Sequence, residues 1–231
     1  MNRTVLITGS TRGIGVETAA EFLKKGDQVV IFSREKQHVE EARERLLAFG
    51  KKEALLSQAG DVRKRKDVER IIRKSMKRFG RIDVLINNAG VGFYGPVEET
   101  TEEKWDHIID TNLKGTFLFL RQIIPIMKRQ GKGIIVNISS GLGVEGMGNF
   151  SAYSASKFGV VGLTRALADE LSDSTIRIYA VLPGAVDTTL LADSGFQMDP
   201  SDLLRPEYVA RKIFEAAQGR RRSGSLITVY S

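Results

Sequence analysis

The sequence lacks cysteine entirely and contains only two histidines. Without cysteine the chain has no disulfide, no thiolate nucleophile and no cysteine-based metal site, which suits a reducing compartment. His38 and His107 are far apart and show no metal-ligand spacing, so a surface or satisfied polar position is the simpler reading of each. We therefore expect no metal, and we predict a cytoplasmic protein.

Long hydrophobic runs are also missing. The N-terminal apolar run, TVLIT, is much shorter than the hydrophobic region of a signal peptide, and no stretch approaches the length of a membrane span. The apolar content of 42% is nevertheless enough for a sizeable core. The sequence predicts a soluble globular protein without a membrane partner.

Acidic residues are fewer than basic ones, and the formal net charge is +7. Such an excess points to an anionic ligand or to nucleic acid. The densest basic runs, RKRK at 63–66 and GRRR at 219–222, carry no interleaved aromatic residues for base stacking. A solvated surface explains them more simply, so we expect no nucleic-acid partner, although the charge helps to attract a polyphosphate.

Apolar runs rich in branched residues alternate with longer amphipathic segments. The predicted strands are TVLIT, QVVIFS, EALLS, DVLIN, GIIVNISS, IRIYAVLP and LITVY. The predicted helices cover 13–25, 35–48, 65–79, 101–129, 151–172 and 206–218. This alternation predicts a doubly wound α/β fold with a parallel sheet covered on both faces, and no linker separates a second domain within 1–231.

One long irregular segment, 184–205, is rich in glycine, aspartate and serine, and we predict a mobile loop or lid there. Its apolar residues either form a pocket wall or anchor the loop on the core, and the sequence leaves both readings open. These residues are Leu190, Leu191, Phe196 and Met198.

The first predicted strand is followed by TGSTRGIG, in which Gly9, Gly13 and Gly15 lead directly into a helix. Glycine allows the backbone to approach a pyrophosphate closely, and a helix N-terminus offers free N–H groups. A glycine-rich turn also serves simple chain reversal. The position between strand and helix favours nucleotide binding.

The other predicted strands also end in polar or small residues, and in a parallel sheet these ends meet at one edge, where ligands bind. Asp61 either accepts a hydrogen bond from an adenine amine or caps a helix. Polar and small residues are common in turns, which explains any one of these strand ends. Turns alone do not explain why all of these residues lie at one edge of the sheet. The remaining candidates are Asn87 and Gly90 in NNAG, Ser139 and Ser140 in NISS, and Thr188 in PGAVDT.

Five motifs, TGSTRGIG, NNAG, NISS, YSASK and PGAVDT, occur in this order and together resemble the short-chain dehydrogenases and reductases. The resemblance covers essentially the whole chain. The chain is similar in general terms to the 3-oxoacyl-acyl-carrier-protein reductases of this family. It implies a Rossmann fold with seven parallel strands in the order 3-2-1-4-5-6-7. It also implies a nicotinamide dinucleotide, a small carbonyl or alcohol substrate, and a homodimer or homotetramer.

The resemblance assigns four catalytic positions: Asn112, Ser140, Tyr153 and Lys157. We choose Ser140 over Ser139 because it precedes the tyrosine by the family's spacing. Tyr153 is expected to give a proton to the carbonyl oxygen, Ser140 to hydrogen-bond that oxygen, and Asn112 to hold a relay water. Lys157, one helical turn from Tyr153, is expected to lower the phenol pKa by about three, which corresponds to ~4 kcal/mol. The resemblance implies that it also binds the ribose.

The cofactor is predicted to be NADP(H). The second predicted strand ends in Ser33, where an acidic residue would pair with a free ribose hydroxyl, and Arg34 follows; Arg12 approaches from the phosphate loop. The alternative is that both arginines are solvated and that Glu35 competes for Arg34. The predicted cofactor-binding residues are Gly9, Ser10, Arg12, Gly13, Ile14, Gly15, Ser33, Arg34, Asp61, Val62, Asn88, Ala89, Gly90, Tyr153, Lys157, Pro183, Gly184, Val186 and Thr188.

These features predict an NADPH-dependent enzyme that reduces a ketone or aldehyde, or oxidises the corresponding alcohol. Sugar-nucleotide epimerases and dehydratases share the YxxxK pair, but their glycine spacing differs and their C-terminal region is larger. A catalytically silent, cofactor-sensing regulator of the same fold is the other alternative. The presence of all four catalytic positions argues against it.

Overall fold

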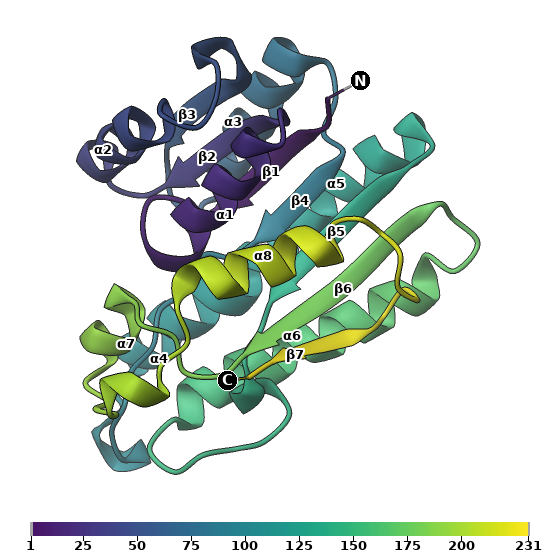
Figure 1. The fold of residues 1–231 in the computed structure, drawn as a ribbon. Coiled ribbons are helices and arrows are strands. Elements are labelled where there is room, and N and C mark those ends of the chain that lie inside the picture. The colour runs from purple at the N-terminus through teal and green to yellow at the C-terminus, as the bar shows by residue number, and fades with distance from the viewer. Residues whose placement is uncertain (1, 231) are drawn as a thin grey trace.

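A single seven-stranded sheet forms the centre of the computed structural model, which describes residues 2–230 (Figure 1). Every paired strand runs parallel to its neighbour, in the order β3-β2-β1-β4-β5-β6-β7. The strands are β1 (Thr4–Thr8), β2 (Gln28–Ser33), β3 (Leu55–Ala59), β4 (Val84–Asn87), β5 (Gly133–Ile138), β6 (Ile176–Pro183) and β7 (Leu226–Val229). The predicted strand order and doubly wound fold are confirmed.

Alternate residues of the strands pack against two different helix layers. Val5 and Ile7 belong to one apolar cluster, whereas Leu6 between them belongs to the other. Because both faces are covered, the strands need apolar residues at successive positions, which explains the continuous branched runs. One layer contains α1 (Gly13–Lys24), α2 (Lys36–Leu46) and α8 (Pro206–Ala216); the other contains α3 (Arg65–Phe79), α5 (Gly115–Gln130) and α6 (Ser151–Glu170).

The helix predicted over 101–129 is interrupted. The chain forms α4 (Glu102–Ile109), then one wide π-helical turn over Asp110–Lys114, and then α5. The Thr116 hydroxyl donates to the Asn112 carbonyl at 2.8 Å within this turn. A π-turn holds one extra residue and is common at functional sites, and here it contains Asn112.

The segment 184–205 is less irregular than predicted. It contains the short helix α7 (Thr189–Ser194) and a 3₁₀ turn at Pro200–Asp202. The backbone N–H of Leu204 donates to the Ala185 carbonyl at 2.9 Å, which joins the two ends of the segment. The N–H of Tyr94 donates to the Ser194 carbonyl at 2.8 Å and ties the segment to the loop after β4.

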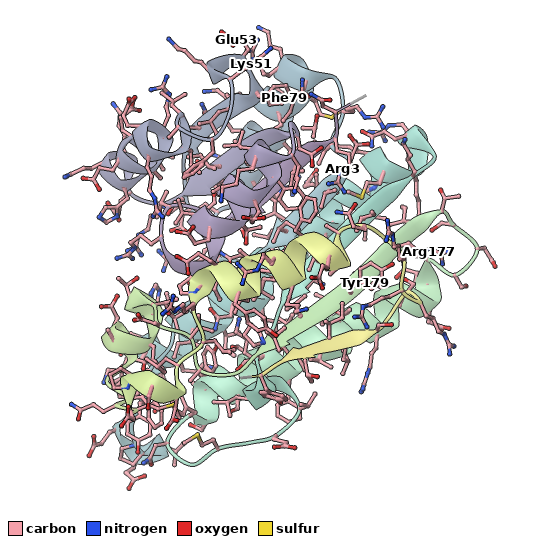
Figure 2. The ribbon with its side chains drawn as sticks, in the orientation of Figure 1. Arg3, Lys51, Glu53, Phe79, Arg177 and Tyr179 are labelled. Atoms are coloured by element: carbon pink, nitrogen blue, oxygen red, sulfur yellow. The ribbon has the colours of Figure 1, made fainter. Side chains whose placement is uncertain are left out.

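At the amino end of the sheet, Arg3 joins β1 to two helices (Figure 2). Its guanidinium pairs with Asp27 at 2.7 Å and lies 5.4 Å and 5.6 Å from the ring centroids of Phe22 and Phe214. This contact fixes α1 and α8 at the edge opposite the predicted site. In residues 2–230, no helix combines the length and apolarity needed to cross a bilayer.

Candidate active site

The carboxyl ends of the strands open into a cleft of about 720 Å³, within the usual range for small-molecule sites. Two predicted site residues, Ser10 and Asn112, do not line it. The predicted residues that do line it are Gly9, Arg12, Gly13, Ile14, Gly15, Ser33, Arg34, Asp61, Val62, Asn88, Ala89, Gly90, Ser140, Tyr153, Lys157, Pro183, Gly184, Val186 and Thr188.

The glycine turn after β1 forms one wall of the cleft, and its backbone conformation depends on glycine. Gly9 and Gly13 have φ angles of 62° and 50°, in the left-handed region that favours glycine. A Cβ atom at Gly9 would lie 2.7 Å from the Ala89 Cα, and one at Gly15 would lie 2.2 Å from the Gly9 oxygen. This cradle stands at the N-terminus of α1, where free N–H groups suit a pyrophosphate.

Ser10 instead joins two strands. Its hydroxyl donates to the Ile7 carbonyl and accepts from the Phe32 N–H, both at 2.8 Å, and the side chain is fully buried. Thr8, which the sequence analysis did not single out, accepts at 3.0 Å from the N–H groups of Asn88 and Ala89. The only sequence feature that could have indicated this role of Thr8 is its position as the polar last residue of the apolar run TVLIT.

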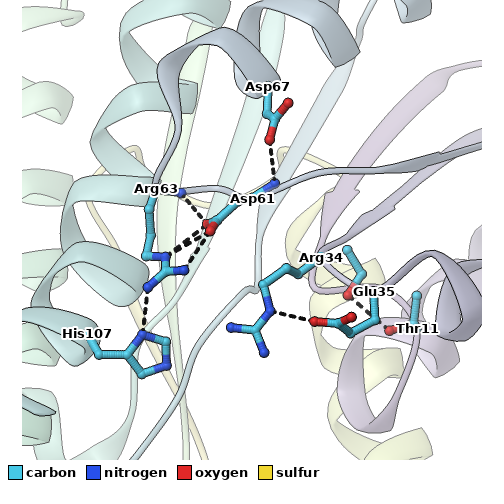
Figure 3. Close-up of polar contacts among 8 residues, drawn as sticks. Thr11, Arg34, Glu35, Asp61, Arg63, Asp67 and His107 are labelled. Carbon is cyan, nitrogen blue, oxygen red and sulfur yellow. Dashed lines mark hydrogen bonds and ion pairs between the residues drawn. The ribbon is translucent and has the colours of Figure 1, made fainter.

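Beyond β3, the Asp61 carboxylate forms an ion pair with the guanidinium of Arg63 (Figure 3). Nε of Arg63 donates at 3.0 Å to both oxygens, and Nη2 donates at 2.6 Å. Burial raises the pKa of Asp61, but the Arg63 hydrogen bonds and the charges of Arg63 and Lys64 outweigh it, so the pKa lies below its ordinary value. Asp61 does not cap α3, which follows Lys64.

His107, on α4, also lines the cleft, and Nη1 of Arg63 lies 2.9 Å from its Nδ1 (Figure 3). A guanidinium only donates, so Nδ1 accepts and a neutral ring carries its proton on Nε2. Burial, followed by the charges of Arg63 and Arg34, lowers the pKa of His107 and favours that neutral ring. Arg63 and His107 are far apart in sequence, so no local motif predicts their contact.

Arg34 and Glu35 form an ion pair at the same end of the cleft, with 2.8 Å between Nε and Oε1. Their side chains are 58% and 55% exposed, so water screens the pair. Glu35 therefore competes with a cofactor phosphate for Arg34, as the sequence analysis considered. Nearby, the Thr11 hydroxyl donates to the Ser33 hydroxyl at 3.2 Å (Figure 3). Arg12 also lines the cleft.

At the other end of the cleft, α6 carries Tyr153 and Lys157 one turn apart. Nζ of Lys157 lies 5.5 Å from the Tyr153 ring centroid and donates to the Ile138 carbonyl at 3.0 Å. Ser139 donates to the Lys157 carbonyl at 2.9 Å, which ties the end of β5 to α6. Ser140 accepts from the Leu142 N–H at 3.2 Å and lies beside the Tyr153 hydroxyl.

The expected lowering of the phenol pKa by Lys157 is absent from this structure. Burial raises the pKa of Tyr153 to about 12, against a smaller opposite effect of the Ser140 hydrogen bond. Burial likewise lowers the pKa of Lys157 to about 8, because desolvation disfavours an ammonium. The prediction failed because it counted charge attraction but not the water that both groups lose. The phenol consequently keeps its proton at neutral pH.

The Asn112 side chain is buried and bonded to protein groups. Nδ2 donates at 2.9 Å to both the Val91 carbonyl and the Ser156 hydroxyl, and Oδ1 accepts from the Val91 N–H at 2.9 Å. Asn112 thus holds the loop after β4 in place beside Lys157. Its role in a water relay stays a prediction.

An aromatic cluster packs beside Tyr153. The Phe150 ring centroid lies 5.9 Å from that of Tyr153, 5.1 Å from that of Tyr94 and 5.4 Å from that of Phe196. The apolar residues of segment 184–205 also line the cleft, so the pocket-wall reading holds for them: Leu190, Leu191, Phe196 and Met198.

Residues 3–198 match the family described as short chain dehydrogenase. The chain belongs to the short-chain dehydrogenase family. A levodione reductase of Leifsonia aquatica is 36% identical to this short-chain dehydrogenase over 221 residues, which are 95% of this chain and 82% of the relative. The predicted family and its oxidoreductase class are confirmed.

Two solved structures extend the comparison to cofactors. A 3-ketoacyl-(acyl-carrier-protein) reductase from Brucella melitensis, complexed with NADH, has a TM-score of 0.92 at 31% identity, covering 99% of this chain and 96% of its own. The protein ElxO with NADP bound has a TM-score of 0.89 at 34% identity, covering 99% of this chain and 97% of its own. These relatives bind nicotinamide cofactors of both kinds.

Burial of Lys157 predicts a pH-dependent stability. Below pH 8, Lys157 is protonated in both the folded and the unfolded protein, and the folded protein bears the full cost of burying the ammonium. Between pH 8 and the ordinary pKa of 10.5, the unfolded protein binds more protons than the folded protein, so the free energy of unfolding rises with pH. Removing the ammonium gains about 3 kcal/mol, less about 1 kcal/mol for the lost bond to Ile138. We expect Lys157→Met to raise the unfolding free energy of the cofactor-free protein by about 2 kcal/mol at pH 7, and by much less at pH 10.

Urea denaturation of wild type, Lys157→Met and Lys132→Met at both pH values checks this. Lys132 is exposed, so its substitution should give no pH-dependent gain. An equal gain from Lys157→Met at both pH values, or a loss at pH 7, would contradict the prediction.

Proposed function

We propose that this short-chain dehydrogenase is an NADPH-dependent carbonyl reductase in which Tyr153 is the proton donor. The observation that carries the proposal is the meeting of Tyr153, Ser140 and Lys157 in one cleft with the glycine-rich turn that follows β1. The same groups serve alcohol oxidation in reverse. The lack of cysteine and the absence of a membrane-spanning helix in residues 2–230 suit a cytoplasmic enzyme.

The residues of the cleft fit a nicotinamide dinucleotide. The turn that contains Gly9, Gly13 and Gly15 would hold the pyrophosphate through backbone N–H groups at the start of α1. A Cβ at Gly9 or Gly15 would clash with the protein backbone at 2.7 Å and 2.2 Å and distort this turn. Lys157 is placed to bind the nicotinamide ribose. When bound, the cofactor supplies the hydride, and the protein supplies position and the proton.

Tyr153 donates its hydroxyl proton to the carbonyl oxygen of the substrate. A phenol with a pKa of about 12 is protonated at neutral pH, so Tyr153 carries the proton that the reaction transfers. Ser140 donates a hydrogen bond to the same oxygen as negative charge develops there. Lys157 is mostly protonated at pH 7, so its ammonium can donate hydrogen bonds to the ribose hydroxyls of a bound cofactor.

Tyr153→Phe removes only the transferable proton. We expect it to abolish carbonyl reduction while NADPH binding stays nearly intact, because the ring and its packing against Phe150 remain. Cofactor oxidation with a panel of ketones, together with NADPH titration, measures both quantities. Tyr208→Phe, in α8 and outside the cleft, is the matched control. Retention of more than about a tenth of wild-type turnover by Tyr153→Phe would show that another group is the acid.

The preference for NADPH is supported by the cations at the adenosine end. Ser33 leaves that end without the carboxylate that would repel a 2′-phosphate, and Arg12 and Arg34 line the cleft beside it. Each charge-assisted hydrogen bond contributes roughly 1.5–3 kcal/mol. Glu35 opposes the preference, because it holds Arg34 and adds a negative charge of its own.

This opposition gives two substitutions with opposite expected effects. Arg34→Ala should reduce the preference for NADPH over NADH by about ten-fold or more, since one charge-assisted bond is lost. Glu35→Gln should increase the preference, because Arg34 is released from its ion pair. Dissociation constants of both cofactors for the three proteins test this. Equal affinities in the wild type, or a preference that neither substitution changes, would refute the assignment.

A homodimer or homotetramer is also proposed. Three large apolar side chains on α4, α5 and α6 are exposed to an unusual degree: Trp105 by 42%, Phe117 by 45% and Phe158 by 44%. Phe117 belongs to the segment GTFLFLRQIIPIM, which carries more apolar residues than one buried face needs. An interface between copies would cover these side chains.

We expect light scattering at micromolar concentration to give the mass of a dimer or tetramer. Phe117→Glu with Phe158→Glu should shift the mass towards that of one chain, because each carboxylate would be buried without a partner. Near-native circular dichroism would show that the double variant still folds. A monomeric wild type would remove the proposal.

A further inference from the structure

We infer that the substrate end of the cleft takes a ketone that carries no negative charge and has an apolar ring beside its carbonyl. This inference rests on the proposed function, since it concerns the group that Tyr153 protonates. It is carried by two independent features of the cleft: an aromatic wall next to Tyr153, and two carboxylates at the substrate end that form no ion pair within residues 2–230.

The aromatic wall is built from three separate segments. Tyr94 follows β4, Phe150 precedes α6 and Phe196 follows α7, and the Tyr94 ring centroid lies 5.1 Å from those of Phe150 and Phe196. These separations are typical of favourable aromatic pairs, so the rings hold one another in place. Of the three, Phe150 and Phe196 line the cleft directly.

This wall is close to the reacting position. Gly92 has no side chain, and a Cβ built on it would lie 3.6 Å from Cδ2 of Tyr153 and 3.5 Å from Cδ2 of Leu190. The loop after β4, the catalytic helix and the segment 184–205 therefore meet around Tyr153. A carbonyl held by Tyr153 and Ser140 places its flanking group among apolar and aromatic side chains, where a ring packs well.

Charged groups at the two ends of the cleft differ in their pairing. At the adenosine end, Arg34 is paired with Glu35 and Arg63 with Asp61. Glu145 follows the turn after β5, and Asp193 lies on α7 after β6, at the substrate end. Between residues 2 and 230, neither carboxylate forms an ion pair within the chain.

Lys157 does not offset these carboxylates for a substrate. It is 3% exposed, and its Nζ donates to the Ile138 carbonyl beneath the reacting position. No other lysine or arginine of the described chain lines this end of the cleft. Met147 and Met198, 43% and 42% exposed, complete an adaptable apolar rim. A negatively charged substrate would meet two carboxylates and an apolar rim, so it should be disfavoured.

The test compares 4-acetylbenzoate with its methyl ester, two aryl ketones that differ in one charge. At low salt with saturating NADPH, we expect kcat/KM for the ester to exceed that for the acid by roughly five- to ten-fold, the effect of two screened carboxylates. Salt should narrow the difference. Equal values for the two ketones would overturn the charge selection.

Substitution separates the pocket from the intrinsic reactivity of the two ketones. Glu145→Gln with Asp193→Asn should shift the ester-to-acid ratio towards the acid by about five-fold, and intrinsic reactivity cancels because the same substrates are compared. Glu98→Gln, an exposed carboxylate outside the cleft, is the control and should leave the ratio unchanged. A ratio that the double variant leaves unchanged would overturn the role of these carboxylates.

The ring preference has its own test. Phe196→Leu keeps an apolar side chain but removes the ring, and it should lower kcat/KM for the ester relative to 2-butanone by roughly three- to ten-fold. An unchanged ratio would overturn the ring preference. Turnover of 2-butanone without turnover of either aryl ketone would overturn the inference and leave the proposed function standing. If no carbonyl compound of a broad panel is reduced, both fail.

Discussion

The close contact between the turn after β1 and the loop after β4 is the constraint on which the site depends. Asn88 donates through Nδ2 to the carbonyls of Thr8 and Gly9 at 3.0 Å and 2.9 Å, while Thr8 accepts from the Asn88 backbone. The chain changes direction across the sheet between these two strands, so the cleft opens there. Side chains at Gly9 or Gly15 would push the two loops apart. The glycine turn after β1 thus packs directly against the loop after β4, and the same loop places Gly92 next to Tyr153.

Burial has opposite consequences at the two ends of the cleft. Near the ends of β2 and β3 the charged groups are partly exposed and paired, as in Arg34 with Glu35, so burial costs them little. At the substrate end Lys157 is buried without a carboxylate partner, and its pKa falls to about 8. The cost of burying this ammonium is found beside Tyr153, and strongly shifted pKa values are common at functional sites.

Much of the fold was predictable because it follows from local patterns. β1, β2 and β6 begin and end where the apolar runs do, and α3 covers the predicted range. The break between α4 and α5 was not predictable, because a π-turn has no strong signature in sequence and this one is stabilised by contacts of Asn112 with Val91 and Ser156. In the site, the glycine turn and the YxxxK pair stood out because their function needs fixed spacing along the chain.

By itself, the sequence determined the parallel sheet, the edge at which the site lies and the residues available there, since periodicity and strand ends are local properties. Only the tertiary structure decided what those residues face. Asp61 is held by Arg63 and backed by His107, Ser10 joins two strands, and Asn112 turns away from the cleft. It also decided that the Tyr153 pKa rises, because desolvation depends on every element packed around a group and not on the neighbour one helical turn away.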